Sequence, residues 1–119
     1  MTYVDGFLLV IPKKNVKAYV NMAKDASKVW IKHGALQYFE CVGDDLQKPM
    51  MLPFPKLTKA KKSDTVWFSF IVYKNKAHRN KVNKLVMADP ALAKFATMKM
   101  PFDMKKMSVG GFKVVVEKR

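Results

Sequence analysis

Acidic side chains inside apolar segments are the residues of this sequence whose types and positions could carry out chemistry. Asp5 lies in the apolar segment 3–11, and Glu40 lies in the segment 35–43. A carboxyl group that a sheet buries must be paired, hydrogen-bonded or protonated. If both groups open onto one cavity, they could act as general acid and base. The alternative interpretation places each acid at a strand rim, bonded to backbone amides or to an arginine.

Asp103 and Arg79 complete the set of ionisable candidates. Asp103 follows an aromatic residue in the turn 100–103, from which it could reach the mouth of a cavity. Arg79 is the one arginine that is not at the end of the chain. It is either an ion-pair partner for an acid or a clamp for the carboxylate of a ligand. The candidate catalytic residues are therefore Asp5, Glu40 and Asp103, and Arg79 is a candidate ligand contact.

Cysteine and histidine are too few to support thiol or metal chemistry. Cys41 follows Glu40 in the predicted strand, so its side chain points to the opposite face, and it is interpreted as a buried structural thiol. His33 and His78 are the only histidines, and no spacing connects either of them with Cys41. Structural zinc sites need four ligands, commonly in closely spaced pairs. We therefore expect no metal site and no cofactor.

The hydrophobic pattern predicts elements that would position these residues. Runs of β-branched and aromatic residues indicate strands, and apolar residues at three- and four-residue spacing indicate helices. Strands are expected at 3–11, 35–43, 65–73 and 108–117, and helices at 13–33, 76–88 and 91–98. Gly34, Asn75 and Asp89 are expected as helix caps. The glycine pair 110–111 indicates a bulge or a close backbone approach.

The order strand, helix, strand, strand, helix, strand is typical of an α+β ferredoxin-like fold. Right-handed crossovers then place the helices on one face of an antiparallel βαββαβ sheet. Segments 3–11 and 65–73 are apolar on both faces, so the second face also needs a cover. A large apolar face marks an interface, and a second copy related by a two-fold axis is the simplest cover. We expect a homodimer, with part of the long segment 46–64 lying on the domain or on its partner.

The aromatic residues suggest where a ligand would bind. Trp67, Tyr38 and Tyr73 are expected, with Trp30, to line a cavity between helices and sheet. Folds of this kind bind small molecules there, although fold alone does not determine function. The predicted ligand contacts are therefore Arg79, Trp67, Tyr38 and Tyr73.

The high net positive charge supports a competing hypothesis, the binding of a polyanion. The 23 basic and nine acidic residues give a net charge of +14, which suits a polyanion or nucleic acid. However, only two of the basic residues are arginines, and the lysines are spread along the chain. Specific phosphate and base contacts favour the planar arginine fork. A solvated lysine-rich surface is the preferred interpretation, and nucleic-acid binding is the alternative.

Length and segment composition indicate the class of protein. The 119 residues suffice for one domain, which we place at 1–119. No run approaches the roughly 20 apolar residues that a membrane-spanning helix needs, and the first residues lack the pattern of a signal peptide. With a lone cysteine, these features favour a cytoplasmic protein without a membrane partner.

The chain also resembles the domain-of-unknown-function 1428 family of small bacterial proteins. The matching segments follow the order of the family and cover nearly the whole sequence: Tyr3–Phe7, Gly34–Leu36, Glu40–Cys41, Asp44–Asp45, Thr65–Val66, Phe68–Ser69, Arg79, Asn83, Met87, Asp89–Pro90, Met100–Asp103 and Gly110–Phe112. The resemblance implies a dimeric α+β barrel. It implies no activity, because the family has none assigned.

Taken together, the residues and the resemblance predict a homodimer with a small apolar cavity in each subunit. If the protein is an enzyme, the embedded acids favour cofactor-independent proton transfer or oxidation of a small aromatic or carboxylic compound. The two alternatives are a polyanion-binding module and a purely structural protein that docks through the apolar part of segment 46–64.

Overall fold

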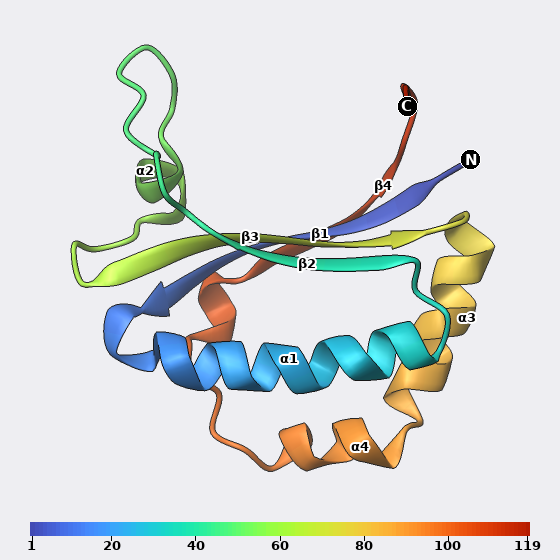
Figure 1. The fold of residues 1–119 in the computed structure, drawn as a ribbon. Coiled ribbons are helices and arrows are strands. Elements are labelled where there is room, and N and C mark those ends of the chain that lie inside the picture. The colour runs from blue at the N-terminus through green and yellow to red at the C-terminus, as the bar shows by residue number, and fades with distance from the viewer.

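Four antiparallel strands form one sheet, and its two central strands are the longest. The computed structural model describes the backbone of residues 1–119 and every side chain except that of Ala96. The strands lie in the order β2 (Gln37–Val42), β3 (Asp64–Tyr73), β1 (Tyr3–Pro12) and β4 (Ser108–Lys113) (Figure 1). The order along the chain and the order in the sheet confirm the predicted ferredoxin-like α+β fold.

The long helices cover one face of the sheet, here named the inner face. This layer contains α1 (Val16–Lys32), α3 (Lys76–Met87) and α4 (Pro90–Ala93), with α4 beyond α1 as seen from the sheet (Figure 1). Single 3-10 turns occur at η1 (Lys13–Asn15), η2 (Lys94–Ala96) and η3 (Met104–Lys106). The predicted helix 13–33 therefore starts as a 3-10 turn, and the predicted helix 91–98 is a short helix followed by η2.

The predicted caps explain where the helices begin and end. The Asn75 side chain accepts a hydrogen bond from the backbone N–H of His78 at 2.8 Å, which caps α3. Gly34 follows the C-terminal end of α1 with a φ of 112°, a conformation that favours glycine. Asp89 accepts a hydrogen bond from the N–H of Ala91 at the start of α4. All three predicted caps are therefore confirmed.

The last strand is shorter than predicted, because β4 ends at Lys113 instead of residue 117. Its partner β1 starts at Tyr3, so the ladder ends there after one further bond from Val114 N–H to the Thr2 carbonyl. The register runs through Gly110 and Gly111 without a bulge. The expected close approach is present at Gly111, where a Cβ would overlap the Tyr3 ring.

The segment between β2 and β3 lies on the opposite, outer face of the sheet. It contains the short helix α2 (Phe54–Thr58), which contacts β3 on the side away from α1 (Figure 1). Two outer-face side chains at this end, Val10 and Val66, are buried. Part of the segment thus lies on its own sheet, whereas Met50 and its neighbours are highly exposed.

The rest of the outer face is apolar and uncovered. Strand pairing places these side chains on it: Val4, Leu8, Phe39, Phe68, Phe70 and Phe112. The Phe70 ring lies 4.9 Å from that of Phe39 and 5.6 Å from that of Phe68, measured between ring centroids. Phe39, Phe68 and Phe112 are exposed. Both faces of the central strands are therefore apolar, as the sequence predicts. In the part of the chain that the structure describes, no helix has the length and apolar character to cross a membrane.

The Asp89 carboxylate joins the end of α1 to the start of α4. Its Oδ1 accepts the bond from Ala91, while its Oδ2 lies 2.6 Å from His33 Nε2 and 3.2 Å from Lys32 Nζ. The hydrogen bond from His33, followed by that from the Ala91 N–H, lowers the pKa of Asp89 to about 2. The folded state therefore favours the ionised carboxylate.

We predict that Asp89→Asn destabilises the fold at pH 5 and that the difference from the wild type narrows as the pH falls toward 2. A lowered folded-state pKa adds stability that is complete above the unfolded pKa, near 3.8, and is lost as the pH falls through the folded value. Urea unfolding of both proteins at several pH values measures the difference. A constant difference over this range would contradict the assignment.

Candidate functional site

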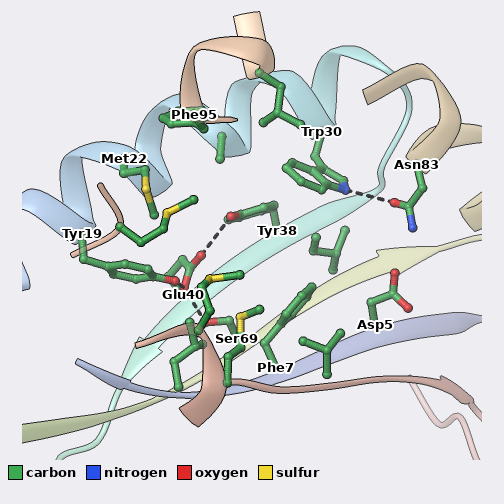
Figure 2. Close-up of a pocket in the computed structure, with 18 of the residues that line it drawn as sticks. Asp5, Phe7, Tyr19, Met22, Trp30, Tyr38, Glu40, Ser69, Asn83 and Phe95 are labelled. Atoms are coloured by element: carbon green, nitrogen blue, oxygen red, sulfur yellow. Dashed lines mark hydrogen bonds between the residues drawn. The ribbon is translucent and has the colours of Figure 1, made fainter. Parts of the chain in front are cut away.

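A cavity of about 640 Å³ lies between the helical layer and the inner face of the sheet (Figure 2). All four strands contribute to its wall, together with α1, α3 and the segment 92–107. Most of the lining side chains are aliphatic or aromatic. Five of them are methionines, which adapt readily to ligands of different shape: Met22, Met87, Met100, Met104 and Met107.

Strand register decides which polar side chains enter this cavity. Asp5 pairs with Ile71 of β3, which pairs with Tyr38 of β2. In the next row toward the cavity centre, Ser69 lies between Phe7 and Glu40. With two strand spacings between β1 and β2, the Cα atoms of Asp5 and Glu40 are about 12 Å apart. Both acids belong to the wall of one cavity, but they are too far apart to share a proton.

Glu40 accepts hydrogen bonds from three hydroxyl groups. Tyr19 donates to Oε1 at 2.8 Å, Tyr38 donates to Oε2 at 2.9 Å, and the Ser69 hydroxyl also donates to Oε1 (Figure 2). These donors come from α1, β2 and β3, so they fix the carboxylate in one orientation. We call these four residues the Glu40 cluster.

The tyrosines of the Glu40 cluster remain hydrogen-bond donors over the whole physiological range. Burial raises the pKa of Tyr19 well above its usual value, and the negative charge of Glu40 raises it further. The same two causes raise the pKa of Tyr38. Each hydroxyl therefore keeps its proton and offers it to the carboxylate.

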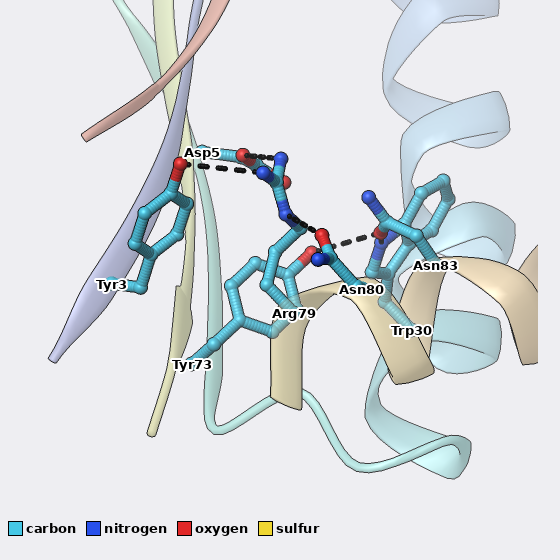
Figure 3. Close-up of polar contacts among 7 residues, drawn as sticks. All are labelled: Tyr3, Asp5, Trp30, Tyr73, Arg79, Asn80 and Asn83. Carbon is cyan, nitrogen blue, oxygen red and sulfur yellow. Dashed lines mark hydrogen bonds and ion pairs between the residues drawn. The ribbon is translucent and has the colours of Figure 1, made fainter. Parts of the chain in front are cut away.

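Asp5 is held differently, by a cation. Arg79 Nη1 donates to Asp5 Oδ1 at 2.8 Å, and Arg79 Nη2 donates to the Tyr3 hydroxyl at 3.3 Å (Figure 3). The guanidinium carbon also lies 4.8 Å from the centre of the Tyr3 ring, and Nε donates to Asn80 Oδ1. Burial raises the pKa of Asp5, while the positive charge of Arg79 acts in the opposite direction.

Asn83 forms the polar wall next to this ion pair. Its Oδ1 accepts hydrogen bonds from Trp30 Nε1 at 3.3 Å and from the Tyr73 hydroxyl at 3.2 Å (Figure 3). Burial, followed by the charge of Asp5, raises the pKa of Tyr73, so this hydroxyl is a donor as well. The cavity therefore has two polar regions in an apolar wall, one around Glu40 and the other around Asp5, Arg79 and Asn83.

Six of the seven predicted site residues lie in the cavity wall or directly behind it. Asp5, Glu40, Tyr38 and Arg79 lie in the cavity wall. Trp67 and Tyr73 lie behind it: the Trp67 ring packs edge-on against Tyr19 at 5.2 Å and its N–H donates to Thr65, while Tyr73 is fully buried.

Asp103 is separate from the cavity wall. It is exposed, and its carboxylate accepts a hydrogen bond from the backbone N–H of Lys105 at the start of η3. This position explains the residue as a cap, because a carboxylate satisfies the free N–H groups of a helical turn. Asp103 is therefore not part of the site described here.

Three polar residues of the wall were not among the sequence-based candidates: Tyr19, Ser69 and Asn83. Ser69 had a usable signal, since it is the one polar residue within the apolar run 66–72. Tyr19 fits the apolar stripe of α1, so its spacing does not separate it from a core residue. Asn83 shows no local pattern that assigns it a role. Among the residues that the structure describes, no three His, Cys, Asp or Glu side chains gather where they could hold a metal ion.

We predict that Arg79→Met destabilises the protein by about 3 kcal/mol, because it leaves the Asp5 carboxylate buried without its cation. The double variant Asp5→Asn, Arg79→Met should be more stable than Arg79→Met alone, since no unpaired charge remains. Urea unfolding at pH 7 measures both. Lys81→Met, an exposed position on the same helix, is the matched control and should change stability by less than about 0.5 kcal/mol. Equal costs for the single and double variants would contradict the pairing.

Comparison with known proteins identifies relatives along nearly the whole chain. The family model described as "Protein of unknown function (DUF1428)" matches residues 2–104. The chain is 36% identical over 117 residues to the uncharacterized protein YbaA of Escherichia coli K12, covering 98% of this chain and 99% of the relative. The YbaA protein of Shigella flexneri matches with the same identity and coverage.

A solved structure supports the fold independently. The chain is similar to a dimeric ferredoxin-like protein from an uncultured marine organism, with a TM-score of 0.54 and 13% sequence identity. The match covers 99% of this chain and 100% of that one. At this identity the likeness supports the ferredoxin-like fold and carries no information about the ligand.

Proposed function

The chain belongs to the DUF1428 family, whose description assigns no function, and we propose that it is a homodimeric protein that binds a small, largely apolar organic molecule in the cavity. One observation carries this proposal: a cavity of about 640 Å³ with an apolar wall and a few fixed polar groups. Small-molecule sites have this size and composition, typically about 300–1,000 Å³. The hydroxyl-bonded Glu40 and the Asn83 amide supply the directional contacts that orient a ligand.

The reaction class, if the bound molecule is transformed, follows from the same groups. Glu40 and Asp5 are the residues through which the site would take up or release a proton. Cofactor-independent proton transfer on a small aromatic or carboxylic compound therefore remains our proposed chemistry. The hydroxyl bonds to Glu40 also support its use as a fixed acceptor, because they hold the carboxylate in place before a ligand enters.

The exposed outer face supports the homodimer. Three phenylalanine rings are exposed on this sheet surface, and a contiguous apolar patch on a protein marks an interaction site. A second copy pairing its own outer face across a two-fold axis covers both patches at once. The structural neighbour is described as dimeric, which favours the same assembly here.

Nucleic-acid binding is the alternative. The exposed lysines occur on the helical side of the sheet and also on its α2 side (Figure 1), which supports a solvated surface instead. Exposed lysines occur on η1, α1, α2 and α3 and in the segments 59–62 and 94–106. A dedicated polyanion site needs its charges on one surface. A salt titration separates the two functions, since phosphate neutralisation makes affinity fall steeply with salt concentration.

We expect 2-phenylethanol, a small apolar probe, to shift the indole N–H signal of Trp30 in nuclear magnetic resonance spectra. The signal of Trp67 should shift much less, because Trp67 lies behind the cavity wall. Ala26→Phe fills the cavity and should weaken binding by about tenfold or more, whereas Ala18→Phe, an exposed position on the same helix, should leave it within about twofold. If neither this alcohol nor its amine and carboxylate analogues shift Trp30, the cavity is not a ligand site.

Phe68→Glu should convert the dimer into a monomer, because it places a charge on the apolar outer face next to Leu8. Ile31→Glu is the matched control: Ile31 is 48% exposed on α1, against 51% for Phe68, and its substitution should leave the dimer intact. Sedimentation equilibrium at micromolar concentration measures the oligomeric state of both variants.

Cys41 is exposed on the outer face, where it pairs with Phe68, and is not buried as the sequence predicted. Its thiol therefore gives a second readout. It should react faster with a thiol reagent in Phe68→Glu than in the wild-type protein. A wild-type protein that sediments as a monomer would overturn the assembly.

A further inference from the structure

Glu40 carries a negative charge in the cavity wall that no cation of the described chain neutralises. Its three partners are neutral hydroxyl groups. Among the described ion pairs none includes Glu40, although the protein has 23 basic residues. Arg79 is the one basic residue of the described cavity wall, and its guanidinium is already bonded to Asp5. This arrangement differs from the usual pairing of a partly buried carboxylate with a cation.

The carboxylate also keeps capacity for one more donor. An ionised carboxylate offers about four lone-pair positions. Oε1 accepts from Tyr19 and Ser69, whereas Oε2 accepts only from Tyr38. A ligand N–H or O–H can therefore bond to Oε2 without displacing any protein donor. Glu40 is half-buried in the cavity wall, so this position is reached from the cavity (Figure 2).

Two of the residues bonded to Glu40, Tyr19 and Tyr38, are aromatic, and each packs against a further ring. Tyr19 packs edge-on against Phe102 with ring centroids 5.7 Å apart, and Trp30 lies 6.0 Å from Tyr38. All four rings belong to residues of the cavity wall. The faces of aromatic rings attract cations, and tryptophan and tyrosine do so most strongly. A fixed carboxylate inside an aromatic wall is the combination that recognises organic ammonium groups.

We propose that the ligand of this cavity is an organic cation, a primary or secondary ammonium group on a small aromatic or aliphatic body, whose N–H donates to Glu40 Oε2. This inference rests on the proposed function, since it needs the cavity to be a ligand site. It narrows the ligand class of the proposed function from aromatic or carboxylic compounds to amines, because a carboxylate would bring a second negative charge toward Glu40 while Arg79 is occupied by Asp5.

The net charge of +14 opposes a cationic ligand, but only weakly at the site. At physiological salt, charges separated by more than about 8 Å are largely screened when they are exposed to solvent. The lysines are exposed on the surface, whereas Glu40 lies in the cavity wall. The contact with the carboxylate therefore outweighs the distant lysines.

The test compares three probes of similar shape with the wild-type protein: protonated 2-phenylethylamine, 2-phenylethanol and 3-phenylpropionate. Affinities come from titration calorimetry at neutral pH, with the Trp30 indole signal as evidence of the binding place. The alcohol offers Glu40 a hydrogen bond only, whereas the ammonium adds attraction between opposite charges and contact with the aromatic rings. We therefore expect the amine to bind about tenfold tighter than the alcohol, or more, and the carboxylate to bind most weakly.

Two variants connect the preference with Glu40. Glu40→Gln keeps the size of the side chain, removes its charge and replaces one acceptor oxygen by an N–H donor. It should lower the affinity for the amine by about tenfold and leave that for the alcohol nearly unchanged, because the alcohol oxygen can accept from the new N–H. Ser69→Ala removes one hydroxyl donor but keeps the carboxylate, and it should preserve the preference for the amine. If Glu40 had only a structural role, Glu40→Gln would change the affinities for the amine and the alcohol by the same factor, or would change neither.

The outcomes separate this inference from the proposed function. Equal wild-type affinities for amine and alcohol, both with Trp30 shifts, overturn the cation preference and leave the cavity as a ligand site. Tightest binding of the carboxylate overturns it in favour of an anionic ligand. If no probe binds, both proposals fail. The wild-type series gives these results even if Glu40→Gln does not fold.

Discussion

The antiparallel register of β1, β3 and β2 is the constraint on which the rest of the structure depends. Side chains alternate between the two faces of a strand, so the register fixes which residues face the helices and which face away. It aligns Phe7, Ser69 and Glu40 in one row of the inner face. A shift of one residue would move Glu40 to the outer face and bring Cys41 into the cavity. The polar contacts of the cavity therefore depend on backbone pairing along the whole of β3.

The two carboxylates of the cavity show two ways of keeping an acid in an apolar environment. Asp5 is paired with Arg79, which compensates its charge but also occupies the guanidinium. Glu40 is bonded by hydroxyl groups, which stabilise its charge and leave the site with a net negative group. The ion pair anchors α3 to the sheet, while Glu40 remains the group with spare bonding capacity. The Asp5 end of the cavity is therefore structural, whereas the Glu40 end is suited to ligand recognition.

The sheet is apolar on both faces, and each face has a different environment. The inner face meets α1, α3 and the cavity, and the outer face meets α2 at one end only. The remaining outer surface contains packed but exposed phenylalanine rings. With 50% hydrophobic residues, the chain has enough apolar side chains for both faces of the sheet, although its helical layer covers only one of them. The cavity and the proposed dimer contact are thus formed by opposite sides of the same strands.

The sequence by itself determined the elements, their order and most of their ends, because these follow from local spacing and capping chemistry. The strand alternation, the caps at Asn75 and Asp89 and the glycine at the end of α1 act over a few residues. The presence of acids in apolar strands was also visible. Where local reasoning failed, as at residues 114–117, the cause was the missing partner strand and not the local composition.

Only the tertiary structure decided which acid is paired and which is hydroxyl-bonded. Arg79 and Asp5 are 74 residues apart in the chain, and Ser69 and Tyr19 lie 29 and 21 residues from Glu40. No local pattern encodes such contacts, because they arise where separate elements pack together. Tyr19 in particular has the spacing of a core residue, and only the packing of α1 on the sheet directs its hydroxyl to Glu40. The physical reason is that spacing along the chain assigns a residue to a face, whereas its partner is set by how the faces meet.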